Sequence, residues 1–305
     1  MENKNIIVGT ENLSKKYNDI YRVENVNLKI FPQEIYGFLG PNGAGKSTTM
    51  KMLLGLVHPT DGKVNILGKP FNSANRISIL KNVGSLIESP SYYGHLTGRE
   101  NMEVLRRLLD LSKKNIDEAI HIVRLENQMN KKVKHYSLGM KQRLGIAMAI
   151  ARFPKLLILD EPTNGLDPAG IEEIRDLIKE LPKQYGMTVM ISSHLLSEIE
   201  QTATAIGIIN HGKMIFQDKM EVLNQKRRSK LLLRTSNNAL AKEVLKNFQM
   251  ENGQNGIILP LLEDEEVGNI VYTLYQNNIR LYRIEEQKNS LEDVFLELTG
   301  KEVAL

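Results

Sequence analysis

The chain contains no cysteine and no tryptophan, and only 6% of its 305 residues are aromatic. Without cysteine, disulfide frameworks and thiolate metal sites are excluded, and the composition fits a reducing compartment. No run approaches the roughly 20 apolar residues that a transmembrane helix needs. Residues 1–17 also lack the apolar core of a secretory signal. If the protein works at a membrane, we expect it to do so as a peripheral subunit.

The rest of the composition is that of an ordinary globular protein, with 41% hydrophobic and 25% charged residues. A length of 305 residues is long for one domain and predicts a main domain with a smaller companion. The net charge of +4 is mild and is typical of a solvated surface of mixed charge. We therefore expect no nucleic-acid partner.

Short apolar segments alternate with helical periodicity, which predicts an α/β fold. The segment Leu156–Leu159 is uniformly apolar, as in a parallel strand that is buried on both faces. The other predicted strands of the main domain are Glu34–Leu39, Lys63–Leu67, Asn82–Ile87 and Thr188–Ser192. The predicted helices are Lys46–Leu56, Arg99–Leu111, Ile116–Leu125, Leu138–Arg152 and Ala169–Gln184.

A polar and basic segment at Asn224–Ser229 marks the predicted edge between two domains. We expect a main domain at 1–223 and a small βα domain at 224–305. The second domain is predicted to alternate strand and helix three times, and it carries no chemical motif. Its predicted elements are Lys230–Thr235, Ala239–Phe248, Gly256–Leu261, Glu265–Asn277, Ile279–Glu285 and Leu291–Thr299. A regulatory, a dimer-stabilising and a merely structural role are all open for it.

The strongest motif is the glycine-rich segment Gly40–Ser47, which matches the phosphate-binding pattern G-x-x-x-x-G-K-[ST]. Glycines let the backbone curl so that successive N–H groups point at phosphate oxygens, and the following helix adds its positive dipole end. Lys46 is placed to reach the β- and γ-phosphates, and Ser47 to ligate Mg²⁺. The residues expected to hold the nucleotide are Gly40, Pro41, Asn42, Gly43, Ala44, Gly45, Lys46, Ser47 and Thr48.

A second phosphate element is the apolar segment Leu156–Leu159, which ends in two carboxylates. The strand carries Asp160 to the carboxyl edge of the sheet, where ligands of open α/β sheets bind. Asp160 is there a candidate Mg²⁺ ligand. Glu161 follows it and is positioned to orient or deprotonate an attacking water.

Together with further motifs, these residues resemble the nucleotide-binding subunits of ABC transporters over about residues 6–217. Tyr17 matches the aromatic residue that stacks on adenine in that family. Ser137 and Gly139 lie in the sequence Tyr-Ser-Leu-Gly-Met, where the family signature usually reads Leu-Ser-Gly-Gly-Gln. The hydroxyl and the backbone N–H at a helix N-terminus are both retained, and they suit a γ-phosphate.

The resemblance implies that each site is completed by the opposite subunit of a homodimer. The residues Ser137, Gly139 and Gln142 would then contact ATP held by the other copy. Asp167, in Asn164–Asp167, matches the D-loop that couples the two sites. His194 matches the switch histidine that contacts the γ-phosphate, so Glu161, His194 and Lys46 are the expected catalytic residues.

One departure from the family pattern is Glu88, which stands where the family usually has glutamine. The substitution, with the sequence that follows it, resembles the ATPases of lantibiotic-immunity and bacitracin-resistance transporters. In the family, the usual glutamine senses Mg²⁺ and faces the membrane partner. With Glu88 in its place, the expected metal-site residues are Ser47, Asp160 and Glu88. Our hypothesis is that Glu88 tunes coupling to the membrane partner; a neutral change at a tolerant position is the alternative.

The fold that the resemblance implies is a P-loop NTPase of the ABC type, with a RecA-like core and a helical subdomain at about 89–153. A small α+β domain follows it. The implied function is ATP hydrolysis, with ATP and Mg²⁺, in an exporter that confers immunity or resistance to antimicrobial peptides. The implied partners are transmembrane permease subunits, at the cytoplasmic face of the membrane. Alternatives are export of another drug, a lipid or an ion, a soluble ABC ATPase acting on ribosomes or DNA, and a plain P-loop kinase or GTPase.

Overall fold

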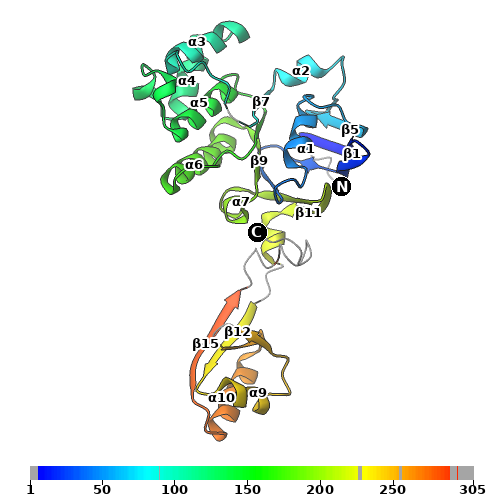
Figure 1. The fold of residues 1–305 in the computed structure, drawn as a ribbon, viewed down its shortest axis with the longest axis vertical. Helices are drawn as coiled ribbons and strands as arrows, with labels where there is room; N and C mark the ends of the chain where they lie inside the picture. Colours follow the sequence, from blue (N-terminus) through cyan, green and yellow to red (C-terminus); the bar gives the residue numbers. More distant parts are fainter. Residues whose placement is uncertain (1–5, 89, 226–228, 254–255, 289–293, 295–305) are drawn as a thin grey trace. The chain divides into compact units, whose positions relative to one another are not determined.

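The computed structural model describes residues 6–88, 90–225, 229–253, 256–288 and 294 (Figure 1). The chain divides into two compact units, the first extending to Met220 and the second lying within Glu221–Glu302. Each unit has its own cluster of buried apolar side chains. Among the described residues, no helix is both long and apolar enough to span a bilayer.

The main sheet of the first unit has six strands in the order β11-β10-β4-β9-β8-β7. All neighbours pair in parallel except β10 and β11, which are antiparallel. β4, β8 and β10 are buried along their whole length, which explains their apolar sequences. The strands are β4 (Ile35–Leu39), β7 (Val83–Leu86), β8 (Leu156–Leu159), β9 (Thr188–Ser193), β10 (Ala205–Asn210) and β11 (Lys213–Lys219).

A second, antiparallel sheet of five strands packs on the first through a shared core. Its order is β2-β1-β5-β6, and β3 also pairs with β1. Val8 and Val64 of this sheet belong to the same buried cluster as Phe38, Met50 and Ile158. The strands are β1 (Val8–Tyr17), β2 (Ile20–Val26), β3 (Lys29–Ile30), β5 (Asp61–Ile66) and β6 (Lys69–Pro70).

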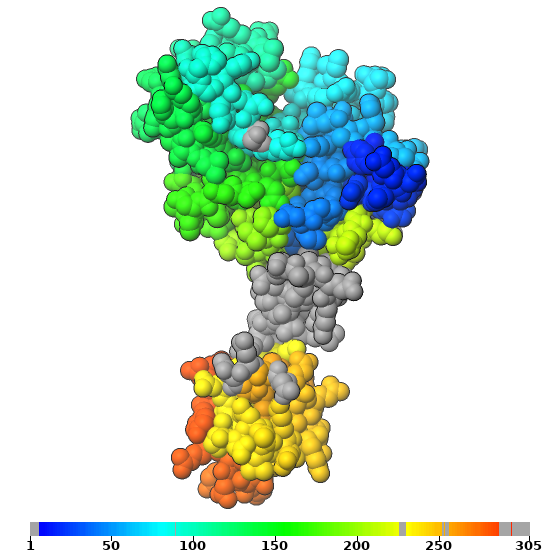
Figure 2. Space-filling view, viewed as in Figure 1, coloured from blue at the N-terminus to red at the C-terminus, as the bar shows by residue number. Residues whose placement is uncertain are grey.

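Three helices lie between β7 and β8 in the sequence and gather in one region of the first unit (Figure 1), where their cyan to green atoms lie together in Figure 2. They are α3 (Gly98–Leu109), α4 (Lys113–Ile122) and α5 (Leu138–Ile150), with 3₁₀ turns at Glu126–Gln128 and Val133–His135. Their starts follow from side-chain caps. Thr97 and Glu100 form a capping box at α3, and Ser112 and Ser137 accept backbone N–H bonds at α4 and α5.

The remaining helices of the first unit contact strands of the two sheets. They are α1 (Lys46–Leu53), α2 (Arg76–Leu80), α6 (Pro168–Tyr185) and α7 (Leu196–Thr202), with α8 (Met220–Gln225) at the unit boundary. Asp167 caps α6, and Gly186 ends it at a φ of 66°. The five predicted helices of the main domain are present, with ends that differ from the sequence prediction by three residues at most.

In the second unit, the described residues form a four-stranded antiparallel sheet with two helices, and the sequence prediction missed one of these strands. The described elements run strand, helix, strand, strand, helix, strand, which is the split βαβ arrangement, with sheet order β13-β14-β12-β15. The strand β13 was not predicted because its three residues are too few to produce a periodic pattern. The predicted helix at Leu291–Thr299 lies outside the described residues, Val294 excepted. The elements are β12 (Ser229–Thr235), α9 (Asn238–Val244), β13 (Glu251–Gly253), β14 (Gly256–Pro260), α10 (Asp264–Gln276) and β15 (Leu281–Lys288).

The core of the second unit gives a stability prediction. Leu233 on β12 is 1% exposed and belongs to the buried cluster with Ile257 and Leu274, whereas its neighbour Leu232 is only partly buried. We expect Leu233→Ala to lower the free energy of unfolding of this unit by about 2–5 kcal/mol, because it leaves a cavity. Leu232→Ala is the matched control and should cost clearly less. Urea unfolding followed by circular dichroism measures both; equal losses would contradict this account of the core.

Candidate functional site

The glycine-rich loop joins the end of β4 to the start of α1, and close backbone contacts require its glycines. Gly45 has a φ of 108°, and a Cβ there would lie 2.6 Å from the carbonyl oxygen of Arg22. A Cβ on Gly40 would lie 2.4 Å from the carbonyl oxygen of Ile209. Larger residues would therefore push the loop away from the strands beneath it.

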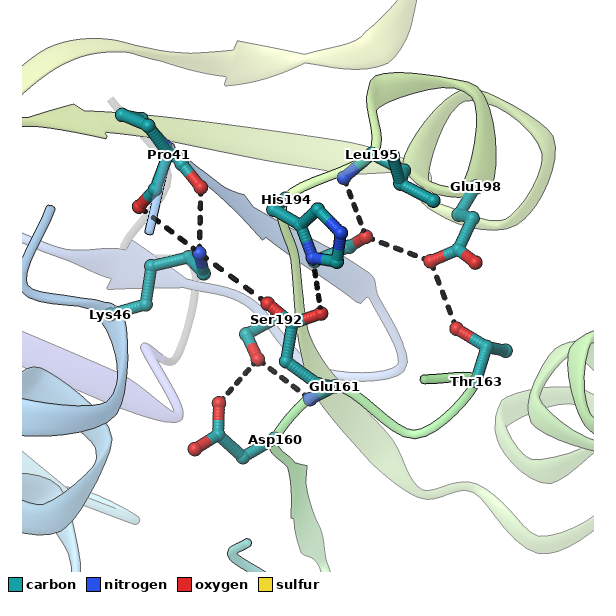
Figure 3. Close-up of polar contacts among 11 residues, drawn as sticks. Pro41, Lys46, Asp160, Glu161, Thr163, Ser192, His194, Leu195 and Glu198 are labelled. Atoms are coloured by element: carbon teal, nitrogen blue, oxygen red, sulfur yellow. Dashed lines mark hydrogen bonds and ion pairs between the residues drawn. The ribbon is translucent and has the colours of Figure 1, made fainter. Parts of the chain in front are cut away.

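Lys46 is the first residue of α1, and its side chain is held inside the loop. Its Nζ donates to the carbonyl oxygens of Gly40 at 2.6 Å and Pro41 at 3.3 Å (Figure 3). The same nitrogen lies 3.4 Å from Oε1 of Glu161. Since the side chain is only 6% exposed, its charge acts in a partly desolvated environment, where electrostatic interactions are stronger than in water.

The two carboxylates at the end of β8 are fixed by a single hydroxyl from β9. Ser192 Oγ donates to Asp160 Oδ1 at 2.5 Å and accepts the backbone N–H of Glu161 at 2.8 Å. Both Ser192 and Asp160 are buried. The backbone of Glu161 turns to a φ of 49°, so its side chain leaves the strand and points away from Asp160 (Figure 3). The hydroxyl bond to its backbone N–H helps to hold this unfavourable conformation.

Glu161 lies between Lys46 and His194 (Figure 3). Its Oε2 is 2.8 Å from His194 Nδ1, on the side opposite to the contact with Lys46. An ionised carboxylate can only accept hydrogen bonds, so the imidazole nitrogen is the donor in this contact. A carboxylate with one cation and one imidazole beside it is suited to orient a water and to take its proton.

Lys46, Glu161 and His194 line one open groove of about 590 Å³. The predicted site residues Gly40, Ala44 and Asp160 are not among its lining residues. The groove brings together the glycine-rich loop, the end of β8, the histidine after β9 and the aromatic residue of β1, as the sequence predicted for a nucleotide site. Arg22, which the sequence analysis did not identify, also faces it. The lining residues are Tyr17, Arg22, Pro41, Asn42, Gly43, Gly45, Lys46, Ser47, Thr48, Glu161, Asn164 and His194.

The signature residues Ser137 and Gly139 and the D-loop residue Asp167 do not line this groove and instead lie at the starts of two helices. Ser137 Oγ accepts the N–H of Met140 at the start of α5. Asp167 Oδ1 accepts the N–H of Gly170 at the start of α6. Gly139 follows in the first turn of α5, while Gln142 is buried further along it. Their predicted nucleotide contacts are therefore not made within one copy of the chain.

Glu88 is also outside the groove and forms an ion pair with α1. Its Oε1 lies 2.6 Å from Lys51 Nζ, and its side chain is 69% exposed. The hydrogen bond from Lys51 lowers the pKa of Glu88, and the same bond raises the pKa of Lys51. Lys51 lies one helical turn after Ser47 and also feels the charge of Asp160. The extra carboxylate is thus neutralised locally, and its predicted role at a metal stays a prediction.

Tyr17 lies at the end of β1, and the residue is 45% exposed. Lys15 Nζ lies 4.9 Å from the ring centroid and donates to the carbonyl oxygen of His58 at 2.9 Å. A cation held against one side of an aromatic ring helps to fix its orientation. The ring is thus an available stacking surface beside the glycine-rich loop.

We did not predict from the sequence the hydroxyl and carboxylate residues that join the segments carrying Glu161 and His194. These are Thr163, Ser192, Ser193 and Glu198. The only local signal was the pair of serines at the end of an apolar strand, just before His194. Glu198 has no local signal, because its partners lie in other segments of the chain.

Comparison with known proteins supports the family resemblance that the sequence motifs indicated. The family model for ABC transporters matches residues 23–164. The bacitracin transport ATP-binding protein BcrA of Bacillus licheniformis is 42% identical over 299 residues, covering 96% of this chain and 97% of that protein. The lantibiotic transport ATP-binding protein SrtF of Streptococcus pyogenes is 46% identical over 211 residues, covering 69% of this chain and 90% of that protein.

A solved structure agrees with these sequence matches. The dimeric ATP-binding cassette MJ0796, in a post-hydrolysis state with ADP and Pi, has a TM-score of 0.63 and 29% sequence identity. The match covers 70% of this chain and 98% of the MJ0796 chain. The predicted P-loop fold of the ABC type is thereby confirmed. The chain belongs to the family of ABC transporter ATP-binding proteins.

Proposed function

We propose that this chain is the ATP-hydrolysing motor of an ABC exporter that protects a cell from an antimicrobial peptide. The observation that carries the proposal is the match, over 96% of the chain, to two bacitracin transport ATP-binding proteins at 42% and 41% identity. The lantibiotic relative aligns over only 211 residues, which cannot include both units in full. This difference favours a bacitracin-type peptide over a lantibiotic as the cargo.

The arrangement at the groove supports a mechanism for hydrolysis. The loop N–H groups and Lys46 neutralise the terminal phosphates, while Glu161 orients water and accepts its proton. His194 keeps the carboxylate in place from its other side. Magnesium bound with the nucleotide would supply further charge neutralisation, and the oxygen donors Ser47 and Asp160 suit this hard cation.

Two copies of the chain are needed to complete each site in this proposal. Ser137 and Gly139 lie at the N-terminus of α5, where free backbone N–H groups favour an anion. They do not line the groove of their own copy. A head-to-tail homodimer would place them on the nucleotide of the other copy, as the dimeric solved relative suggests.

The surface beside Glu88 suits a permease helix. A cleft of about 380 Å³ lies between the end of β7 and helices α3 and α5. Its lining is largely apolar and includes Leu56, which is 61% exposed, together with Leu105 and Met148. An amphipathic helix of a membrane partner could bury its apolar face in such a cleft. This would place the chain at the cytoplasmic face of the membrane as a peripheral subunit.

The central catalytic prediction concerns Glu161→Gln. We expect ATP binding to persist and turnover to fall on the order of 10²–10³-fold, because the amide cannot accept a proton from water. The unhydrolysed nucleotide should then hold two copies together. ATPase assays with size-exclusion chromatography in the presence of ATP measure both effects. Glu172→Gln, an exposed carboxylate on α6, is the control; monomers with normal turnover in Glu161→Gln would refute the assignment.

A second prediction separates Glu88 from the chemical step. We expect Glu88→Gln to change resistance in cells more than basal ATPase activity, because its exposed ion pair contributes little to the site itself. The control is Asp117→Asn, which removes another exposed ion pair, 2.6 Å from Arg99. Equal losses of resistance and hydrolysis would sink the coupling hypothesis.

The cargo is tested by survival of bacteria that express the chain with its neighbouring membrane genes. The panel contains bacitracin, several lantibiotics and unrelated drugs, and the chain is compared as wild type and as Glu161→Gln. We expect protection against bacitracin that the variant abolishes. Protection against a lantibiotic, another drug or no compound at all, with ATPase activity intact, would reject bacitracin as the cargo while leaving the motor in place.

A further inference from the structure

Glu198 lies on α7, outside the nucleotide groove, and contacts both segments that carry catalytic residues (Figure 3). Its Oε2 accepts a hydrogen bond from Thr163 Oγ1 at 2.9 Å and another from Ser193 Oγ at 2.8 Å. Thr163 stands two residues after Glu161, and Ser193 directly precedes His194. Both hydroxyl residues are buried while Glu198 is partly exposed, so these bonds are partly shielded from water.

These contacts close a ring of covalent and hydrogen bonds. From Glu161 the chain leads through Pro162 to Thr163, whose hydroxyl bonds to Glu198. The same carboxylate oxygen bonds to Ser193, which leads to His194. His194 Nδ1 then lies 2.8 Å from Glu161 Oε2 and completes the ring. The relative position of Glu161 and His194 is thus fixed twice. Their direct contact holds them at the groove, and the bonds to Glu198 hold the segments that carry them at α7.

The hydroxyl of Ser193 makes a second hydrogen bond. Its Oγ accepts the backbone N–H of Leu195 at 2.9 Å while it donates to Glu198. The turn that carries His194 is therefore closed by the same hydroxyl that binds Glu198. Loss of the acceptor on α7 would leave two buried hydroxyls, those of Thr163 and Ser193, without this partner.

We infer that Glu198 is a positioning residue for hydrolysis, which sets the distance between His194 and Glu161. The inference rests on the proposed roles of these two residues in catalysis. Thr163 also leads directly into the D-loop segment Asn164–Asp167. Glu198 therefore ties the loop that reaches toward a second copy to the histidine turn, so that a shift of one is passed to the other.

One carboxylate oxygen accepts both bonds, which gives a sharp pair of variants. Glu198→Gln keeps a carbonyl oxygen that can accept from both hydroxyls, whereas Glu198→Leu removes the acceptor at similar size. We expect Glu198→Leu to lower kcat roughly tenfold or more, since misplaced catalytic groups are slow. KM and the affinity for a fluorescent ATP analogue should stay near the wild-type values. Glu198→Gln should restore most of the activity.

The control is Glu172→Leu, which removes an exposed carboxylate on α6 and should leave kcat unchanged. A second readout combines Glu198→Leu with His194→Ala. If Glu198 acts by placing His194, the double variant should be no slower than His194→Ala alone. A general structural defect would instead add its own loss and would also weaken binding of the ATP analogue.

Three results would overturn the inference: a normal kcat in Glu198→Leu, additive losses in the double variant, or a Glu198→Gln variant as slow as Glu198→Leu. The ATPase activity of the wild-type full-length chain shows whether the role of Glu198 or the proposed function itself has failed. An active wild type with any of these results rejects only the role of Glu198. A wild type without ATPase activity rejects the motor itself.

Discussion

The parallel pairing of β4, β8 and β9 is the constraint on which the rest of the site depends. Leu39 pairs with Ser193, and Leu159 pairs with Ile191, so all three strands end at one edge of the sheet. The glycine-rich loop, the two carboxylates and the histidine turn each follow one of these ends. Residues far apart in the sequence are thereby brought to contact distance at the carboxyl edge of the sheet, where open α/β sheets bind their ligands.

Hydroxyl groups then convert this proximity into a defined geometry. Ser192 fixes Asp160 and the backbone of Glu161, while Ser193 and Thr163 meet on Glu198. All three hydroxyl residues are buried, and a buried polar group that loses its hydrogen-bond partner costs free energy. The polar residues behind the groove thus help to hold the segment of Glu161 in place, together with those that line the groove.

The sequence predicts best what a contiguous segment encodes. The loop Gly40–Ser47 and the strand with Asp160 and Glu161 carry their chemistry in a few adjacent residues, and both lie where they were expected. Tyr17 and His194 were reached through family resemblance, because neither has a distinctive local pattern. The bond from Thr163 to Glu198 and the ion pair of Lys51 with Glu88 join residues 35 and 37 positions apart, so no local pattern reveals them.

The second unit shows another limit of sequence reasoning. Its predicted strands and helices within the described residues are present, but β13 was missed because it is too short to produce a periodic pattern. Strand pairing there is antiparallel and joins β12 to both β14 and β15. Such long-range pairing depends on the whole core rather than on the order of elements. The role of this unit in regulation or dimer formation stays a prediction.

The claim that two copies complete each site can be tested most directly by cross-linking, since the chain has no cysteine of its own. Asn42→Cys, in the glycine-rich loop, and Leu138→Cys, beside Ser137, place exposed thiols on the two proposed halves of a site. They are introduced together into the Glu161→Gln chain and treated with a short thiol cross-linker. We expect covalent dimers to form in the presence of ATP and not in the absence of nucleotide. Absence of ATP-dependent dimers, in a chain shown to bind ATP, would contradict it.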